Sequence, residues 1–280
     1  MEINDILSKK ILTEAKGYLD VGFTHSLNPY SGCAFSCSYC YVREMPIQKF
    51  KEIPWGDWVD IKRNAAENYR KEILSLRKKH KPVNIFMSTA TDPYQPLERD
   101  AQITRAVLTE MNDNPPDFLQ IQTRSPLVAR DIDLLVQLAE KCRVLVSMTI
   151  ETDREDIKRI FAPKAPGIRL RLKALKEIHD AGLSTQAAIS PVLPFTPDFP
   201  ELLAGTVDHI WIDTLNIGDG AMGKRSMRLG MGQLFSKHEL SKWYRDDIHW
   251  AVEKYFKKYF KEDIIRVSKQ EAFPIKEREL

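Results

Sequence analysis

The chain has 280 residues, a formal net charge of +3 and four cysteines. This length is enough for a single α/β barrel with an ordinary core, and so few cysteines exclude a disulfide-rich scaffold and favour a reducing compartment. No apolar run approaches the about 20 residues that a membrane-spanning helix needs, and the amino terminus lacks a signal-peptide pattern, so we expect a cytoplasmic protein without membrane contact.

Strand and helix patterns alternate along most of the chain. The apolar runs that predict strands are the segment before Cys33 and residues 83–88, 118–123, 143–150, 185–189 and 209–213. Helical patterns cover residues 61–79, 132–140 and 170–181, and Gly182 ends the last of them. Strands that alternate with helices predict parallel βα units. Ligands bind at the carboxyl ends of such strands, where the motifs described below fall.

The most informative motif is Cys33-x3-Cys37-x2-Cys40, which brings three thiolates within reach of one metal centre. A structural zinc site uses four protein ligands, usually as two Cys-x-x-Cys pairs, and the sequence has no second pair. Iron–sulfur clusters are held by thiolates at such short spacings, and three cysteines leave one iron open to an outside ligand. The alternative is a zinc loop completed by His25 or Cys142. Cys142 is more simply a buried structural thiol.

Further motifs follow the cysteines in order along the chain. They are Asn28–Cys33, Thr91–Glu98, Thr123–Leu127 with Arg130 and Asp131, and Pro163–Pro166 with Arg171. Together with Tyr39 before the last cysteine, these motifs resemble the radical S-adenosylmethionine enzymes. Within that superfamily they are most similar to the branch that contains spore photoproduct lyase and its photolyase-like relatives. The resemblance covers residues 20–195, and several motifs in order are far more specific than any one of them.

The resemblance implies both a fold and a chemistry. The fold is a partial parallel βα barrel of about six units over residues 1–215, with a loop and helix over residues 216–280 as part of the same domain or an extension. Cys33, Cys37 and Cys40 are expected to hold a 4Fe-4S cluster that binds S-adenosylmethionine at its open iron. An electron donor of the flavodoxin or ferredoxin type would drive cleavage to a 5′-deoxyadenosyl radical, which abstracts hydrogen from substrate. Relatives suggest a damaged or modified nucleic acid, and the sequence does not identify the substrate further.

The resemblance also assigns cofactor contacts to individual residues. Tyr39 is expected to contact the adenine. Thr91 and Asp92 are expected near the methionyl amine and carboxylate, where a carboxylate would pair with the ammonium group; an Asx-type turn before Pro93 is the alternative for Asp92. Arg124 stands where close relatives usually carry lysine, so it keeps the charge that pairs with the cofactor carboxylate but changes the geometry.

Two serines and a second tyrosine complete the predicted site. Ser147 aligns with a strand serine that binds the cofactor; the equal alternative is a serine that only packs within the strand. Ser190 occupies the position of a backbone contact to adenine. Tyr41 matches a tyrosine implicated in hydrogen-atom relay and is the predicted catalytic residue, with packing of the loop against the barrel rim as the alternative.

Two departures separate this chain from spore photoproduct lyase itself. That enzyme has a hydrogen-donating cysteine two residues before the position of Thr91, and this chain has Thr89 there. An O–H bond is too strong to replace a thiol as donor to a substrate radical, so we do not expect the same route. The family's Glu-Pro is Ala162-Pro163 here, so the contact that this glutamate makes is either missing or supplied elsewhere, with Glu151 as the candidate.

The last third of the chain is rich in glycine and cations. Gly218–Gly223 matches G-x-G-x-x-G, but the βαβ unit that a dinucleotide site requires does not follow it. Residues 218–232 include Lys224, Arg225 and Arg228 and predict a mobile cationic loop that recognises substrate at the barrel mouth; a solvent-exposed connector is the alternative. Residues 238–261 predict one helix, whose lysine-rich outer face is more typical of a solvated packing helix than of a phosphate-binding one.

The main alternative to an enzyme is a non-catalytic binding module. In that hypothesis the cysteines form a structural metal loop on a barrel, and the cationic loop and basic tail dock nucleic acid or a protein partner. The net charge of +3 neither requires nor excludes a nucleic-acid partner, because local patches matter more than the total.

Overall fold

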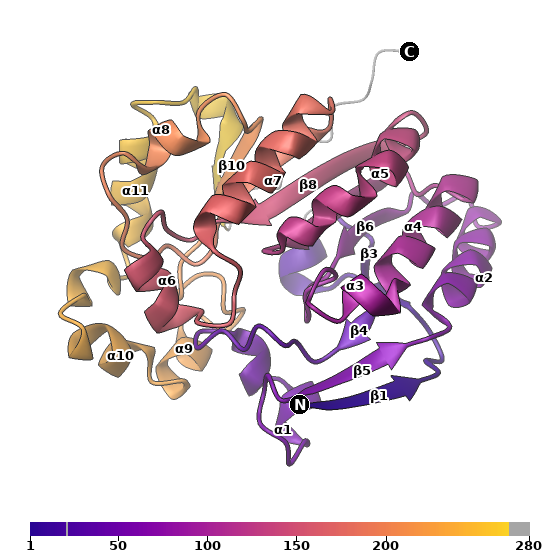
Figure 1. The fold of residues 1–280 in the computed structure, drawn as a ribbon, viewed down its shortest axis with the longest axis horizontal. Coiled ribbons are helices and arrows are strands. Elements are labelled where there is room, and N and C mark those ends of the chain that lie inside the picture. Colours follow the sequence, from indigo (N-terminus) through magenta and orange to yellow (C-terminus); the bar gives the residue numbers. More distant parts are fainter. Residues whose placement is uncertain (21, 269–280) are drawn as a thin grey trace.

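An eight-stranded sheet forms the centre of the computed structural model, which describes residues 1–20 and 22–268 (Figure 1). The strand order is β11, β10, β9, β8, β7, β6, β3, β2. Neighbouring strands from β3 to β11 are parallel, and β2 is antiparallel to β3. The bounds are β2 (Leu12–Glu14), β3 (His25–Leu27), β6 (Asn84–Met87), β7 (Phe118–Thr123), β8 (Arg143–Thr149), β9 (Ser184–Ile189), β10 (His209–Ile212) and β11 (Ile265–Val267). The expected α/β class is confirmed, and β2 and β11 are the two ends of an open, partial barrel.

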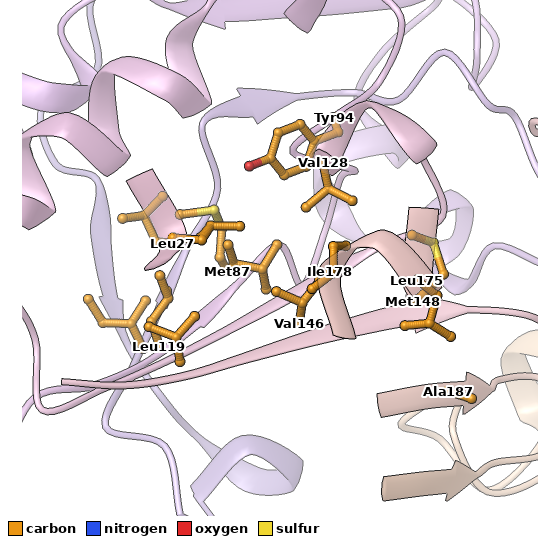
Figure 2. Packing of buried hydrophobic residues seen from close by; sticks show 14 of the residues in the cluster. Leu27, Met87, Tyr94, Leu119, Val128, Val146, Met148, Leu175, Ile178 and Ala187 are labelled. Carbon is orange, nitrogen blue, oxygen red and sulfur yellow. The ribbon is translucent and has the colours of Figure 1, made fainter. Parts of the chain in front are cut away.

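The central strands are buried on both faces, which is typical of parallel strands covered by helices. In β8, all residues after Arg143 are buried. Figure 2 shows how Val146 and Met148 of β8 pack against Leu175 and Ile178 of the helix that precedes β9. Each fully buried aliphatic side chain contributes about 1.5–3 kcal/mol relative to an exposed one. These contacts fix the strand ends on which the candidate site is built.

The longer helices cover the outer face of the sheet (Figure 1). They are α2 (Ala65–Arg77), α4 (Ile103–Asp113), α5 (Ile132–Ala139) and α7 (Ile168–Asp180). Short helices lie in the connections: α1 (Pro46–Lys49), α3 (Glu98–Ala101), α6 (Glu155–Phe161) and α8 (Phe199–Leu203), with 3-10 turns η1 (Gly17–Asp20), η2 (Tyr41–Glu44), η3 (Pro126–Asp131), η4 (Ser241–Trp243) and η5 (Glu262–Ile264). None of the described helices is long and apolar enough to cross a lipid bilayer.

A small second sheet supports the segment that leads into the cysteines. Its strands are β1 (Glu2–Ile6), β5 (Trp58–Lys62) and β4 (Tyr30–Ser31), with β5 in the middle. The predicted helix over 61–79 begins later, at Ala65, because residues 58–62 pair with β1 and β4 instead. Gly32 follows β4 with a φ of +81°, and a Cβ there would lie 2.4 Å from the carbonyl oxygen of Trp58. Glycine is therefore required at the entrance of the cysteine loop.

The last third of the chain differs from the prediction. The single helix expected over 238–261 is wrong: the structure has η4, then α11 (Ile248–Phe256), then β11, which pairs in parallel with β10. Trp243 packs on Phe195 with ring centroids 4.9 Å apart, which places the segment before α11 against the core. Residues 218–232 contain α9 (Lys224–Arg228) and the start of α10 (Met231–Lys237). The domain boundary near residue 215 stays a prediction, although β11 adds a strand to the same sheet.

Candidate functional site

The cysteine loop, residues 32–40, lies against the carboxyl ends of the strands through hydrogen bonds to two distant segments. Thr91, just past β6, donates from its hydroxyl to the carbonyl oxygen of Gly32, and the Ala34 amide donates to Oε1 of Gln95 at 2.9 Å. Farther along the loop, the amide and the hydroxyl of Ser38 both donate to the carbonyl oxygen of Phe161 at 2.9 Å. The loop is therefore bound to the rim on both sides of its middle cysteine.

The middle of the loop needs small residues. Ser36 has a φ of +50°, and its hydroxyl donates to the carbonyl oxygen of Trp55 at 2.9 Å. A Cβ on Gly56, which has a φ of +98°, would lie only 2.2 Å from the Cβ of Ser36. The close approach of these two backbones fixes the turn between Cys33 and Cys37.

The three thiols form one electrostatic group in a region of low solvent exposure. Burial raises the pKa of Cys33, Cys37 and Cys40, and the thiols of this group further raise the pKa values of Cys33 and Cys40. Arg124 lowers the pKa of Cys37, but burial outweighs it, whereas an iron–sulfur cluster would stabilise the thiolates directly. The donor set therefore fits a cationic, thiolate-bound group.

The alternative zinc ligands lie elsewhere. His25 is at the amino end of β3, where its Nδ1 is 2.8 Å from the Thr24 hydroxyl, and Cys142 precedes the amino end of β8. Both are at the opposite end of the strands from the cysteine loop. Within residues 1–20 and 22–268, no three His, Cys, Asp or Glu side chains, those of Cys33, Cys37 and Cys40 included, are arranged to hold one metal ion. A zinc loop completed by His25 or Cys142 is thus not supported.

Asp92 links the ends of β6 and β7. Its buried carboxylate accepts hydrogen bonds from the Tyr94 amide at 2.9 Å, the Thr123 hydroxyl at 2.7 Å and the Arg124 amide at 2.9 Å. Burial raises the pKa of Asp92, although these donors oppose the shift. The Asx-type turn that the sequence left as an alternative is therefore present. Asp92 is also close enough to raise the pKa of Cys33, so its predicted cofactor contact stays a prediction.

Arg124, Tyr39 and Glu151 form a buried cluster beside the cysteine loop. The Arg124 guanidinium donates to the Tyr39 hydroxyl at 2.7 Å and pairs with Glu151, and the Tyr39 hydroxyl also donates to Glu151. Arg171, which is 0% exposed, donates to the second oxygen of Glu151 at 2.6 Å. Burial alone would raise the pKa of Glu151, but Arg171 and Arg124 outweigh it and hold that pKa at about 2. Glu151 therefore lies among three of the motif residues, as a substitute for the lost Glu-Pro carboxylate would.

The two predicted serines have different environments. Ser147 is fully buried in β8, and its hydroxyl accepts a hydrogen bond from Nε2 of Gln186 at 2.7 Å. Ser190 follows β9 and donates to Oδ2 of Asp213 at 3.4 Å. Sequence reasoning missed Asp213, which directly follows β10 and is buried; burial raises its pKa to about 7. The sequence signal that could have identified Asp213 is an acidic residue immediately after an apolar strand.

Tyr41 is next to the position of the missing cysteine. Its hydroxyl donates to the carbonyl oxygen of Thr89, and the side-chain amide of Asn28 donates to the Thr89 hydroxyl at 3.1 Å. Burial raises the pKa of Tyr41, and Asp213 and Arg225 are near enough to act on it electrostatically. The predicted relay residue and the position of the absent thiol are therefore adjacent.

The segment of residues 216–230, which we call the cap segment, folds around one carboxylate. Asp219 is buried and accepts hydrogen bonds from backbone amides at 2.7–3.1 Å; the donors are Ala221, Gly223, Arg225 and Ser226. Arg225 donates from its side chain to the Asp219 carbonyl oxygen at 2.6 Å, and Arg228 pairs with Glu44 at 2.7 Å. The predicted loop therefore has an internal fold in which two of its three cations have structural contacts; its mobility and its role in substrate recognition stay predictions.

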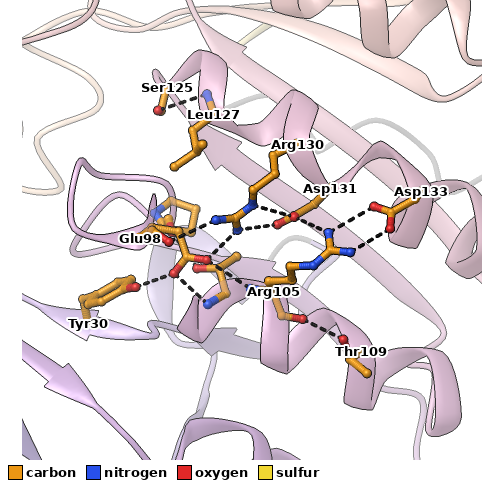
Figure 3. Close-up of polar contacts among 11 residues, drawn as sticks. Tyr30, Glu98, Arg105, Thr109, Ser125, Leu127, Arg130, Asp131 and Asp133 are labelled. Carbon is orange, nitrogen blue, oxygen red and sulfur yellow. Dashed lines mark hydrogen bonds and ion pairs between the residues drawn. The ribbon is translucent and has the colours of Figure 1, made fainter. Parts of the chain in front are cut away.

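A second buried network lies behind the rim (Figure 3). Glu98 is fully buried and accepts hydrogen bonds from the Tyr30 hydroxyl, the Thr104 amide at 2.9 Å and Arg130 at 2.7 Å. Arg130 and Arg105 both pair with the buried Asp131, at 2.8 Å and 2.7 Å. Many of the residues that carried the family resemblance therefore hold the scaffold.

Replacing Glu98 by alanine is expected to destabilise the fold by about 3–5 kcal/mol, because Tyr30, Thr104 and Arg130 lose the acceptor that they share in a buried network. Urea denaturation measures this loss. The matched control is Asp133→Ala, which removes a carboxylate that is 54% exposed and pairs with Arg105 at 2.7 Å; we expect a cost of about 1 kcal/mol or less. Similar costs for the two variants would contradict a scaffold role for Glu98.

Comparisons with known proteins agree with this geometry. The model of the Radical SAM superfamily matches residues 27–204. An uncharacterized protein of Methanocaldococcus jannaschii is 31% identical over 206 residues, which cover 74% of this chain and 73% of that protein. An uncharacterized protein of Mycobacterium tuberculosis is 26% identical over 204 residues, which cover 71% of this chain but only 58% of that protein. The structure of spore photoproduct lyase complexed with dinucleoside spore photoproduct has a TM-score of 0.64 at 14% identity and covers 95% of this chain and 81% of its own; at this identity the likeness shows the fold.

Proposed function

Because this chain belongs to the radical SAM superfamily, we propose that it is an enzyme that cleaves S-adenosylmethionine at a 4Fe-4S cluster held by Cys33, Cys37 and Cys40. The observation that carries the proposal is the position of the three thiols on one loop at the carboxyl ends of the parallel strands, with His25 and Cys142 at the other end. With the cluster and cofactor bound, this chemistry supplies a 5′-deoxyadenosyl radical for hydrogen abstraction.

The residues around the loop have separate tasks in this proposal. Arg124 supplies a positive charge for the cofactor carboxylate, and Asp92 a negative charge for its ammonium group. Tyr39, Ser147 and Ser190 would contribute the remaining cofactor contacts. Arg124 is already paired with Glu151, so the cofactor carboxylate would share this cation with Glu151. Since Arg171 also neutralises Glu151, the Arg124–Glu151 pair can loosen without leaving a bare buried carboxylate.

The proposed substrate is a damaged or modified nucleic acid. Spore photoproduct lyase, whose fold this chain shares, has been crystallised with dinucleoside spore photoproduct. Thr89 stands where spore photoproduct lyase has a thiol donor, so the proposed reaction would return hydrogen to the product radical by a different route from that enzyme. Tyr41, whose hydroxyl contacts the Thr89 carbonyl oxygen, is the proposed relay residue. The proposal includes a flavodoxin or ferredoxin type of electron donor and the reducing environment of the cytoplasm.

Anaerobic reconstitution tests the enzyme proposal against a structural metal loop. We expect a brown protein with about four irons per chain that forms 5′-deoxyadenosine when dithionite and S-adenosylmethionine are added. Iron analysis and chromatography of the products measure the two results. A colourless protein with one zinc and no cleavage would instead support the binding-module alternative and overturn the proposal.

A further inference from the structure

A cavity of about 420 Å³ lies at the outer edge of the barrel rim. Asn216 and Met222 of the cap segment line it, together with His249 and Trp250 at the start of α11 (Ile248–Phe256). Ser268, the residue after β11, also lines it. The cavity is therefore at the carboxyl ends of β10 and β11, the edge at which parallel sheets bind ligands. Its size is within the usual range for small-molecule sites.

The walls suit a flat ligand. Trp250 is 61% exposed and Met222 is 75% exposed, although both belong to ordered elements that line the cavity. The indole of Trp250 lies 4.8 Å from the His249 ring, which holds it on one side and leaves the rest of the indole exposed. An exposed indole at the mouth of a cavity is a surface on which a planar ring stacks.

The polar groups of the cavity select against anions. Among the described residues that line the cavity, Asp246 contributes a negative charge, and no lysine or arginine contributes a positive one. Oδ1 of Asp246 accepts a hydrogen bond from the side-chain amide of Asn216 at 2.7 Å, which holds the carboxylate in place. Nδ1 of His249 is buried and has no hydrogen-bond partner within the described part of the chain. A phosphate would be repelled here, whereas a ligand edge with N–H donors would pair with the carboxylate.

We propose that this cavity binds an unstacked nucleobase that carries an exocyclic amino group. Cytosine, adenine and guanine present such a group, and a carboxylate that accepts from an amino group is a known form of base readout. Thymine has no exocyclic amino group and offers the carboxylate only its single ring N3–H, in addition to stacking on Trp250. The inference rests on the proposed nucleic-acid substrate and adds how that substrate is held: one base leaves the strand and enters this cavity. The phosphates remain outside the cavity, because it lacks cations.

Fluorescence anisotropy with labelled single strands tests the inference on the full, anaerobically reconstituted chain. The strands are oligo(dC), oligo(dT) and an abasic strand of equal length at one salt concentration. We expect oligo(dC) to bind about tenfold or more tightly than the abasic strand, with oligo(dT) in between. Trp250→Ala should remove most of the advantage of both base-bearing strands, and Trp250→Phe should restore it. Asp246→Asn should remove the preference for oligo(dC) over oligo(dT).

Two further measurements make the result decisive. Phe50→Ala is the matched control, because Phe50 is an 88% exposed aromatic residue at the end of α1 that does not line the cavity, and its removal should change no affinity. Circular dichroism confirms that each variant is folded. If wild type and Trp250→Ala bind all three strands alike, the inference fails. Formation of 5′-deoxyadenosine by the same wild-type sample shows separately whether the proposed chemistry stands, because base binding does not depend on cofactor cleavage.

Discussion

Replacing Cys33, Cys37 or Cys40 individually by alanine is expected to abolish cluster binding and S-adenosylmethionine cleavage. Each thiol is one of three donors at one site, and losing a direct ligand should exceed the 10–100-fold loss that is usual for residues behind the ligands. The loop should still close, because its hydrogen bonds come from Ser36, Ser38 and backbone groups. The effect is measured by the iron content per chain and by the visible absorption of the bound cluster.

Cys142→Ala provides the internal control for this series. Cys142 lies just before β8, at the end of the strands opposite the loop, and packs against the main core. We expect unchanged iron content and a modest loss of stability, of about 1 kcal/mol, from the smaller, partly buried side chain. If the Cys142 variant lost iron while one of the three loop variants kept it, the proposed ligand set would be wrong.

Replacing Glu151 by glutamine is expected to cost about 3–5 kcal/mol of folding stability. The change leaves Arg171, which is fully buried, and Arg124 without the carboxylate that neutralises them. Urea denaturation of the cluster-free chain isolates this effect from metal binding. The matched control is Asp156→Asn in a nearby exposed pair with Arg154, for which we expect about 1 kcal/mol or less.

The pH dependence of the Glu151 effect has a defined sign. Arg171 and Arg124 lower the pKa of Glu151 from 4.5 to about 2, against the opposing effect of burial. A carboxylate with a depressed pKa in the folded state stabilises the fold above its unfolded pKa and loses that contribution as the pH falls. The stability difference between wild type and Glu151→Gln should therefore be largest above pH 4.5 and shrink toward pH 2. A difference that stayed constant across this range would show that Glu151 acts through packing and not through its charge.

The central strands could be predicted from the sequence because each is a continuous apolar run that stands between charged helices. Phe118–Thr123 was predicted to the residue, and the other central strands differ by one or two positions. The short strands were missed for a physical reason. Residues 58–62 mix apolar and charged side chains because one face of β5 is partly exposed, and β11 has only three residues. Pairing with a neighbour, and not an internal pattern, makes such segments into strands.

The parts of the candidate site that belong to a motif could be predicted. The contacts between residues that are distant in the sequence could not. The cysteines, Asp92 and Arg124 were identified from their motifs, and the structure brings them to one rim. Asp213 had no motif, and its burial beside Ser190 depends on the pairing of β9 with β10. The internal fold of the cap segment could not be predicted from the sequence, because glycine and cations occur alike in a loose loop and in a tight one. One buried carboxylate, Asp219, decides between them, and its hydrogen bonds appear only after folding.

The rim also sets an order of events during protein synthesis. Two contacts that support the cysteine loop and the residues after it can form only late in synthesis. Ser38 donates to Phe161, which is 123 residues farther along the chain, and Glu44 pairs with Arg228, which is 184 residues farther along. Ribosomes add roughly 5–20 residues per second, so the cysteines leave the ribosome on the order of ten seconds before the segments that close over them. During that interval the thiols are open to the cellular machinery that delivers iron and sulfide. Loading of the proposed cluster could therefore begin on the growing chain, before these supports of the rim have formed.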